Sequence, residues 1–198
     1  MPFFRQTLFI SLAVFCFSIS HGATKPRILA SIPPQKAFVQ AIAGQEVDVM
    51  ILLKPGQNPN TFALTPRLLA EALKAEVYFL MGIPMEKLIF SKLKRQNSSI
   101  QFIDTSRGIR KRSFENHSHG QQEDKSSHHH ITDPHIWLSP GLVIAQLQHY
   151  YRALIELLPG KEVLLKKNLN NFRNTLKETD EKLSKMLRPF AVSYTDLK

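Results

Sequence analysis

The sequence predicts an α/β fold in which helices cover both faces of a parallel sheet. Short apolar segments with the length and composition of buried strands lie at residues 27–31, 47–52, 77–81 and 100–103. Segments in which apolar residues recur at helical spacing alternate with them, at 35–43, 65–73 and 85–96. Strands that alternate with helices through short connections are typical of parallel sheets.

Glycine and proline residues mark where these elements begin and end. Gly44 follows the first helical segment, as glycine commonly does at a helix C-terminus, and Thr65-Pro66 is expected to open the second helix. Ligands of open parallel sheets bind beyond the carboxyl ends of the strands. The loop at 56–60 leaves the second strand at that end, so it is a candidate binding loop.

A polar segment at 104–132 interrupts the alternation and has too few apolar residues to bury a core. We expect a mobile loop, whose histidine-rich part spans 114–131. Five histidines lie in this part: His117, His119, His128, His129 and His130. Clustered imidazoles favour zinc, copper or nickel. Weak metal capture by the loop is therefore predicted, and a solvated polar insert is the alternative.

The octet Asp-Pro-His-Ile-Trp-Leu-Ser-Pro at 133–140 follows this loop and contains the only tryptophan. Prolines on both sides restrain the backbone around His135. Ser139 can cap the next helix, and Pro140 suits the first helical position because its missing N–H would be unpaired there anyway. Taken alone, His135 has two interpretations, a metal ligand or a structural histidine.

Two helices are expected after the octet, at 141–158 and 161–187. The second would be about 40 Å long at 1.5 Å per residue. Its apolar stripe favours packing along its own domain, and a coiled-coil partner is the alternative. Residues 190–192 would then begin another strand.

The first 23 residues have the features of a secretory signal peptide: Arg5, an apolar run at 8–19, and small residues around Gly22 and Ala23. An uncleaved anchor is the alternative, and no later stretch is long enough for a membrane span. The only cysteine, Cys16, lies inside the apolar run, so the exported chain would have no disulfide and no thiolate ligand.

Charge and motif content narrow the function classes. The net charge of +10 is attributed to a solvated basic surface, because an export signal argues against nucleic-acid binding. The sequence contains no glycine-rich phosphate loop. Asp133, His135 and Ser139 are too close in sequence to form a catalytic triad, so no enzymatic activity is expected.

These features together resemble the zinc/manganese solute-binding proteins of bacterial ABC importers. The resemblance is carried by the export signal, Pro-Gly-x-x-Pro-x-x-Phe at 55–62, the octet and the long helix, and the histidine-rich loop points to the high-affinity zinc-uptake branch. It implies a periplasmic protein with two α/β lobes joined by a long helix. A metal held between the lobes, zinc or alternatively manganese, would be passed to a membrane permease.

The resemblance also implies a division of the chain. Residues 24–158 would form the amino-terminal metal-binding lobe, 159–188 the linking helix, and 189–198 the start of a second lobe that is expected to be largely missing after Lys198. His135 matches a ligand of the family. Asn60 stands where the family has its first histidine and Tyr194 where it has its third, and the fourth ligand would be a carboxylate of the second lobe.

Several expectations remain open at this point. An amide oxygen such as that of Asn60 suits calcium or magnesium better than zinc, so the site is expected to be weak or degenerate. A metal buffer that works through the histidine-rich loop, an adhesin, and a non-functional remnant are the alternatives. Phe62 and Trp137 are expected to be cleft walls or core aromatics, and Glu86 a salt-bridge partner at the edge of the lobe.

Overall fold

The computed structural model describes residues 24–112 and 132–191. The predicted signal peptide at 1–23, the five histidines of the loop, and Tyr194 lie outside these residues. Their predicted roles are therefore not tested by the structure.

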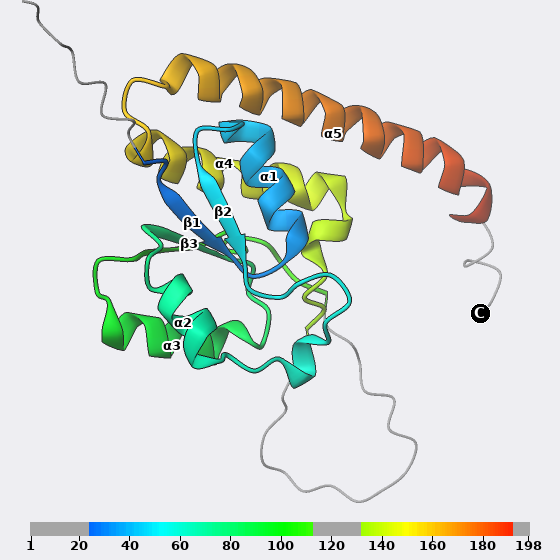
Figure 1. The fold of residues 1–198 in the computed structure, drawn as a ribbon. Helices are drawn as coiled ribbons and strands as arrows, with labels where there is room; N and C mark the ends of the chain where they lie inside the picture. The colour runs from blue at the N-terminus through cyan, green and yellow to red at the C-terminus, as the bar shows by residue number, and fades with distance from the viewer. Residues whose placement is uncertain (1–23, 113–131, 192–198) are drawn as a thin grey trace, which may run out of the picture.

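A four-stranded parallel sheet forms the centre of the molecule, in the order β2-β1-β3-β4. Its strands are β1 (Arg27–Ala30), β2 (Asp48–Ile51), β3 (Val77–Leu80) and β4 (Gln101–Asp104). Each lies within one residue of a predicted apolar segment. The expected α/β class is confirmed, and all four carboxyl ends meet at one edge of the sheet (Figure 1).

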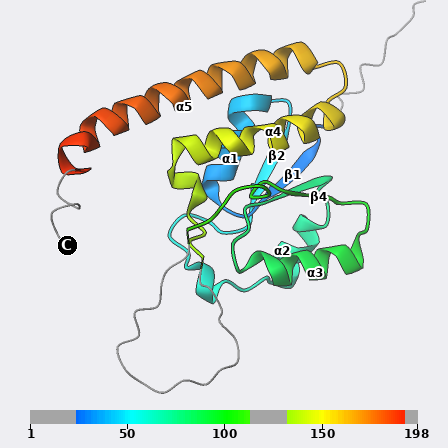
Figure 2. The ribbon, with the colours of Figure 1, turned by 180° about the vertical axis from the view of Figure 1, so that it is seen from behind.

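Helices cover both faces of the sheet (Figures 1 and 2). One face carries α2 (Pro66–Ala72) and α3 (Glu86–Gln96). The other carries α1 (Pro33–Ala43) and α4 (Pro140–Leu157), and α5 (Glu162–Ala191) packs across those two. Within residues 24–112 and 132–191, no helix has both the length and the apolar composition needed to cross a bilayer.

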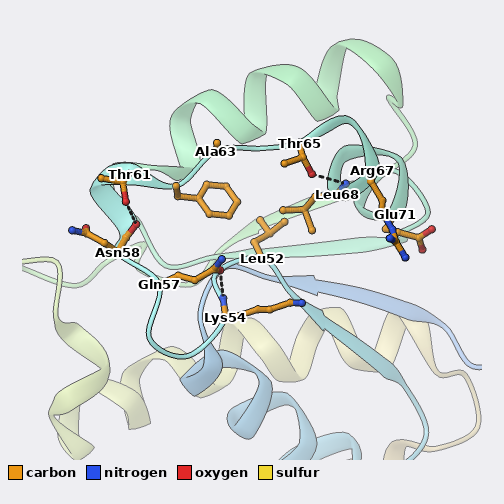
Figure 3. A pocket seen from close by; sticks show the side chains of 11 residues that line it. Leu52, Lys54, Gln57, Asn58, Thr61, Ala63, Thr65, Arg67, Leu68 and Glu71 are labelled. Atoms are coloured by element: carbon orange, nitrogen blue, oxygen red, sulfur yellow. Dashed lines mark hydrogen bonds between the residues drawn. The ribbon is translucent and has the colours of Figure 1, made fainter.

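The helix ends follow from local chemistry. The Thr65 hydroxyl accepts a hydrogen bond from the Leu68 N–H at 3.3 Å and so caps α2 (Figure 3). Ser139 does the same for the Leu142 N–H at 3.5 Å, with Pro140 in the first turn of α4, as expected. Gly44 ends α1 with a φ of 60°, a conformation that glycine adopts without strain.

Two predicted helix boundaries were wrong. Helix α1 begins at Pro33, before the expected residue 35, because the fixed φ of proline suits the first helical positions. Phe190 and Ala191, expected to begin a strand, belong to the last turn of α5. A short apolar run cannot be assigned to a strand rather than a helix by periodicity alone.

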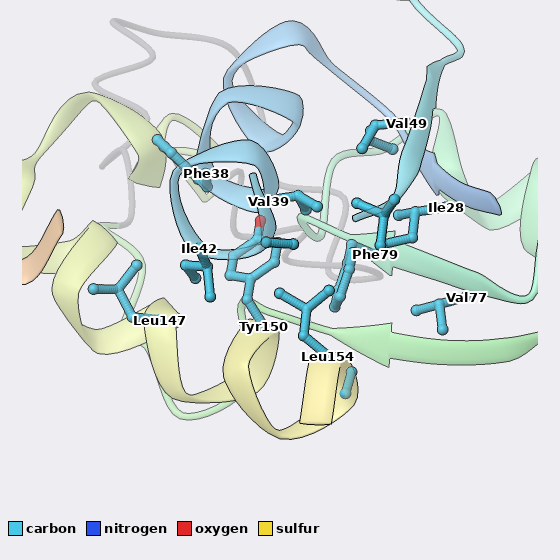
Figure 4. Close-up of a cluster of buried hydrophobic side chains, with 14 of the residues drawn as sticks. Ile28, Phe38, Val39, Ile42, Val49, Val77, Phe79, Leu147, Tyr150 and Leu154 are labelled. Atoms are coloured by element: carbon cyan, nitrogen blue, oxygen red, sulfur yellow. The ribbon is translucent and has the colours of Figure 1, made fainter. Parts of the chain in front are cut away.

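One hydrophobic core lies on each face of the sheet, and successive residues of a strand point alternately into the two cores, as in any pleated sheet. Leu29 and Tyr78 face α2 and α3, whereas Ile28 and Phe79 face α1 and α4. In the core beneath α1 and α4, Tyr150 and Leu154 of α4 point toward β3 (Figure 4). The ring centroids of Tyr150 and Phe79 are 4.6 Å apart. The sheet is thus buried on both faces.

Only the first half of α5 packs on the lobe. Leu165 and Leu169 are buried against it, and Phe172 and Leu176 are partly buried. In the second half Leu183 and Leu187 are 39% and 59% exposed, and the helix projects beyond the lobe (Figures 1 and 2). The expectation that α5 lies along its own domain therefore holds for its first half.

A buried carboxylate joins the elements at the carboxyl edge. Glu86 is only 4% exposed and forms no ion pair with another described residue, so the expected salt bridge at the edge of the lobe is wrong. Its carboxylate accepts hydrogen bonds from the N–H groups of Met81, Gly82 and Ile83 at 2.9, 2.7 and 3.1 Å, and from the Ser31 hydroxyl. Burial raises the pKa of Glu86, and these hydrogen bonds oppose the rise.

The network continues inward from Ser31. The Ser31 hydroxyl lies 2.8 Å from the Tyr78 hydroxyl, and burial raises the pKa of Tyr78. Gln35 accepts from the Ser31 N–H at 2.8 Å and donates to the Phe79 carbonyl at 2.8 Å. The network therefore connects β1, α1, β3 and α3.

Glu86→Gln tests this network. Both carboxylate oxygens accept N–H donors, so one of them would be replaced by an amide NH₂ that faces other donors. We expect the free energy of unfolding to fall by about 2–3 kcal/mol, the usual cost of a buried polar group without a partner. Urea denaturation at pH 7 measures it. Glu178→Gln on α5 is the matched control, and an equal effect of the two substitutions would contradict the assigned role.

Candidate metal centre

A pocket of about 640 Å³ lies at the carboxyl edge of the sheet. Residues that follow three strands line it, together with part of the octet: Ile32, Leu53, Pro59, Ile83, Pro84, Met85, Pro134, His135 and Trp137. The Glu86 network holds the segment at 81–83 that forms part of this wall. The fold thus brings Pro59, the neighbour of Asn60, and His135 to the same pocket.

His135 is held by Asp133 through two hydrogen bonds. Asp133 Oδ1 accepts the His135 backbone N–H at 2.9 Å and lies 2.7 Å from His135 Nδ1. These hydrogen bonds hold the pKa of Asp133 below its usual range, so it is ionised at neutral pH. An ionised carboxylate can only accept, so Nδ1 carries the ring proton and Nε2 of the neutral imidazole presents a lone pair.

This arrangement is the one that metal-binding histidines adopt. Such a histidine usually donates its second ring N–H to a carboxylate or carbonyl, which fixes the tautomer and orients the ring. The side chain of His135 is 55% exposed, so Nε2 can be reached from solvent. The geometry therefore favours the ligand interpretation of His135 over a structural core histidine.

The octet is anchored on both sides of His135. Before it, the Asp133 N–H donates to the Arg112 carbonyl at 2.7 Å, which ties the octet to the segment that precedes the histidine-rich loop. After it, the 3₁₀ turn η2 (Ile136–Leu138) buries Ile136 in the core and leads into the cap of α4. Trp137 is half-buried beside His135, with ring centroids 5.0 Å apart, so it both lines the pocket and packs on the core.

The loop that carries Asn60 is braced by its own hydrogen bonds. Gln57 accepts from the Lys54 N–H at 2.9 Å, and the Thr61 N–H donates to the Asn58 carbonyl at 3.2 Å. Asn60 lies in the 3₁₀ turn η1 (Pro59–Thr61). Phe62 lines a different pocket, of about 720 Å³, and does not line the pocket of His135.

Few metal-ligating residues come together in the described part of the chain. No group of three or more histidine, cysteine, aspartate or glutamate side chains there could hold a metal ion. The structure brings Asp133 and His135 together, whereas the five loop histidines lie outside the described residues. The contact between Asp133 and His135 was not predicted, although the two residues are only two positions apart in the octet.

The chain is similar to a family of known proteins over most of its length. The family zinc-uptake complex component A, periplasmic (ZnuA) matches residues 28–194. A crystal structure of ZnuA superimposes with a TM-score of 0.72 at 32% sequence identity, covering 84% of this chain and 60% of that one.

Two relatives have names that refer to zinc. The high-affinity zinc uptake system protein ZnuA of Yersinia pestis is 26% identical over an alignment of 178 residues, which covers 82% of this chain and 56% of the relative. The zinc-binding lipoprotein AdcA of Streptococcus pneumoniae is 25% identical over an alignment of 174 residues, which covers 85% of this chain and 34% of the relative. This chain thus spans about 60% or less of the length of these relatives.

The family match covers most of the chain, and the parallel sheet with the octet at its carboxyl edge fits it. The chain belongs to the ZnuA family of zinc-uptake solute-binding proteins.

Proposed function

We propose that this chain is a periplasmic metal-binding component of an ABC importer, which captures zinc and delivers it to a membrane permease. The observation that carries the proposal is the Asp133–His135 pair at the pocket of the carboxyl edge. Family membership supports it, because relatives of this chain are named for zinc binding and zinc uptake. No catalytic role is proposed.

Zinc is the cargo that the donor chemistry favours. Neutral imidazole suits zinc, whereas manganese, the alternative, prefers carboxylate, carbonyl and water oxygens. Nε2 of His135 would supply one of about four donors. Water and Asn60 would supply weaker ones, and His117, His119, His128, His129 and His130 would add imidazoles at the entropic cost of ordering their loop.

The domain organisation is part of this proposal. Residues 24–158 would be the metal-binding lobe, and the helix within 159–188 would link it to a second lobe that begins in 189–198. The exposed apolar side chains in the second half of α5 support a linking role, because that part of the helix packs against nothing in the described lobe.

A metal buffer is the second candidate function, favoured by the five histidines that lie within residues 117–130. It would hold several zinc ions weakly through the loop and would not depend on His135. The two functions therefore differ in stoichiometry and in which histidines matter.

Replacing His135 separates the two functions. We expect His135→Ala to abolish a one-to-one zinc site, measured by isothermal titration calorimetry in a buffer that does not bind zinc. Replacing the five loop histidines by asparagine should leave that site, weakened by no more than about tenfold. His149→Ala is the control, because His149 bonds the Arg107 carbonyl on another part of the lobe. Zinc binding that survives His135→Ala but is lost with the loop histidines would instead show a buffer.

Asp133→Asn tests the support of the ligand. The amide can no longer act as an ionised acceptor, so we expect zinc affinity to fall about tenfold or more, as for other carboxylates that hold metal-binding histidines. Competition with a chromophoric chelator measures the affinity, and ¹⁵N chemical shifts of His135 report its tautomer. Asp180→Asn on α5 removes the same charge at a distance. Unchanged affinity together with an unchanged tautomer would refute the role of Asp133.

A further inference from the structure

The side chain of Lys111 joins two loops that are far apart in sequence. Its ammonium donates a hydrogen bond to the Gly82 carbonyl at 2.8 Å, across a separation of 29 residues. Lys111 lies in the segment that precedes the histidine-rich loop and is only partly exposed, whereas Gly82 lies in the loop after β3. The hydrogen bond therefore connects the base of the histidine-rich loop to the carboxyl edge of the sheet.

Gly82 leaves room for this hydrogen bond. Its φ of 74° lies in the left-handed region, which glycine adopts without strain. A Cβ atom added at this position would collide with Lys111 Nζ and Ser106 Oγ. The N–H of Gly82 is already held by the Glu86 carboxylate at 2.7 Å. Gly82 is thus held on both sides, through its N–H by Glu86 and through its carbonyl by Lys111.

Beyond Lys111 the chain connects directly to the octet. The carbonyl of Arg112, the next residue, accepts the Asp133 N–H at 2.7 Å. Asp133 Oδ1 in turn lies 2.7 Å from Nδ1 of His135. A continuous series of hydrogen bonds and backbone therefore runs from the buried Glu86 carboxylate to the imidazole, and Lys111 is its middle member.

The two ends of this series belong to different parts of one pocket wall. Residues 83–85, which follow Gly82, form one part, and residues 134, 135 and 137 of the octet form another. Within residues 24–112 and 132–191, no other hydrogen bond joins the loop at 81–85 to the segments at 107–112 and 132–140. Among the described contacts, Lys111 thus supplies the directional link between the two parts of the wall.

We propose that Lys111 is a positioning residue for the metal site, because its ammonium ties the octet to the loop after β3 and so holds His135 in place on the pocket wall. This inference rests on the proposed function, in which Nε2 of His135 binds the cargo. Lys111 itself would not contact the metal. It would act through Arg112 and Asp133, since a hydrogen bond fixes distance and direction, whereas apolar packing is not directional.

The charge of Lys111 makes this role separable from electrostatics. Lys111, Arg110 and His135 line one hollow of about 400 Å³. A cation in this hollow repels a zinc ion at His135, so removal of the charge should by itself strengthen zinc binding. Loss of the tie should instead weaken zinc binding. The two effects thus have opposite signs for the same substitution.

Lys111→Met removes the ammonium and keeps most of the length of the side chain. We expect the zinc affinity of the whole chain to fall about three- to tenfold, less than after loss of a residue that bonds the ligand itself. Competition with a chromophoric chelator measures it. Arg110→Met is the matched control, because it removes the same charge from the same hollow, and Arg110 forms no ion pair with a described carboxylate. The control should bind zinc as tightly as the unaltered chain or more tightly.

Measurements on the zinc-free chain distinguish positioning from general stability. In Lys111→Met the Asp133 amide hydrogen should exchange about threefold faster or more, because its acceptor is less firmly held, whereas the Tyr78 amide in the central strand β3 should exchange as before. The ¹⁵N chemical shifts of His135 should change from a ring protonated at Nδ1 to a mixture of tautomers. Arg110→Met should alter neither quantity.

Three results would overturn the proposal. The first is zinc binding by Lys111→Met that is unchanged or tighter. The second is an unchanged Asp133 exchange rate together with an unchanged His135 tautomer. The third is an equal acceleration of exchange at Asp133 and Tyr78, which would show a loss of stability alone. Failure of the proposed function gives a different result, namely zinc binding that is unaffected by His135→Ala, and the zinc-free measurements would still report on Lys111.

Discussion

The buried carboxylate of Glu86 is the interaction on which the carboxyl edge of the sheet depends. The chain changes direction after β3, and three successive backbone N–H groups there have no strand or helix partner of their own. Glu86 accepts all three and also the hydroxyl of Ser31 from the end of β1. Such groups would otherwise be costly to bury. The Glu86 side chain alone thus holds in place the segment at 81–83, which forms part of the wall of the pocket that His135 lines.

Two carboxylates with opposite environments define the region around the pocket. Burial raises the pKa of Glu86, whose carboxylate binds backbone N–H groups, whereas hydrogen bonds from His135 lower the pKa of the partly exposed Asp133. Glu86 holds the pocket wall in place, and Asp133 holds the His135 ring in place. His135 is consequently oriented without being buried, which leaves its side chain open to solvent.

Local patterns predicted most of the fold because strands, helices and caps depend on neighbours in sequence. The strand at 77–81, the cap at Thr65 and the octet leading into α4 are examples. The burial of Glu86 was missed because its partners include Ser31, 55 residues earlier in the chain. Likewise, the Asp133 N–H finds its acceptor, the Arg112 carbonyl, only on the other side of the histidine-rich loop. The candidate site was predicted through a family resemblance, whereas its hydrogen bonds required the fold.

Helix α5 combines two sources of stability within 30 residues. Its first half is held by Leu165 and Leu169 in the core, so amide hydrogens there should exchange only when the lobe unfolds. Its second half has Leu183, Met186 and Leu187 exposed and relies on helix propensity, so it should open by local fraying. The helix therefore carries a gradient of hydrogen-exchange protection along its axis, from the rate of global unfolding near Leu165 to that of a solvated peptide helix near Leu187.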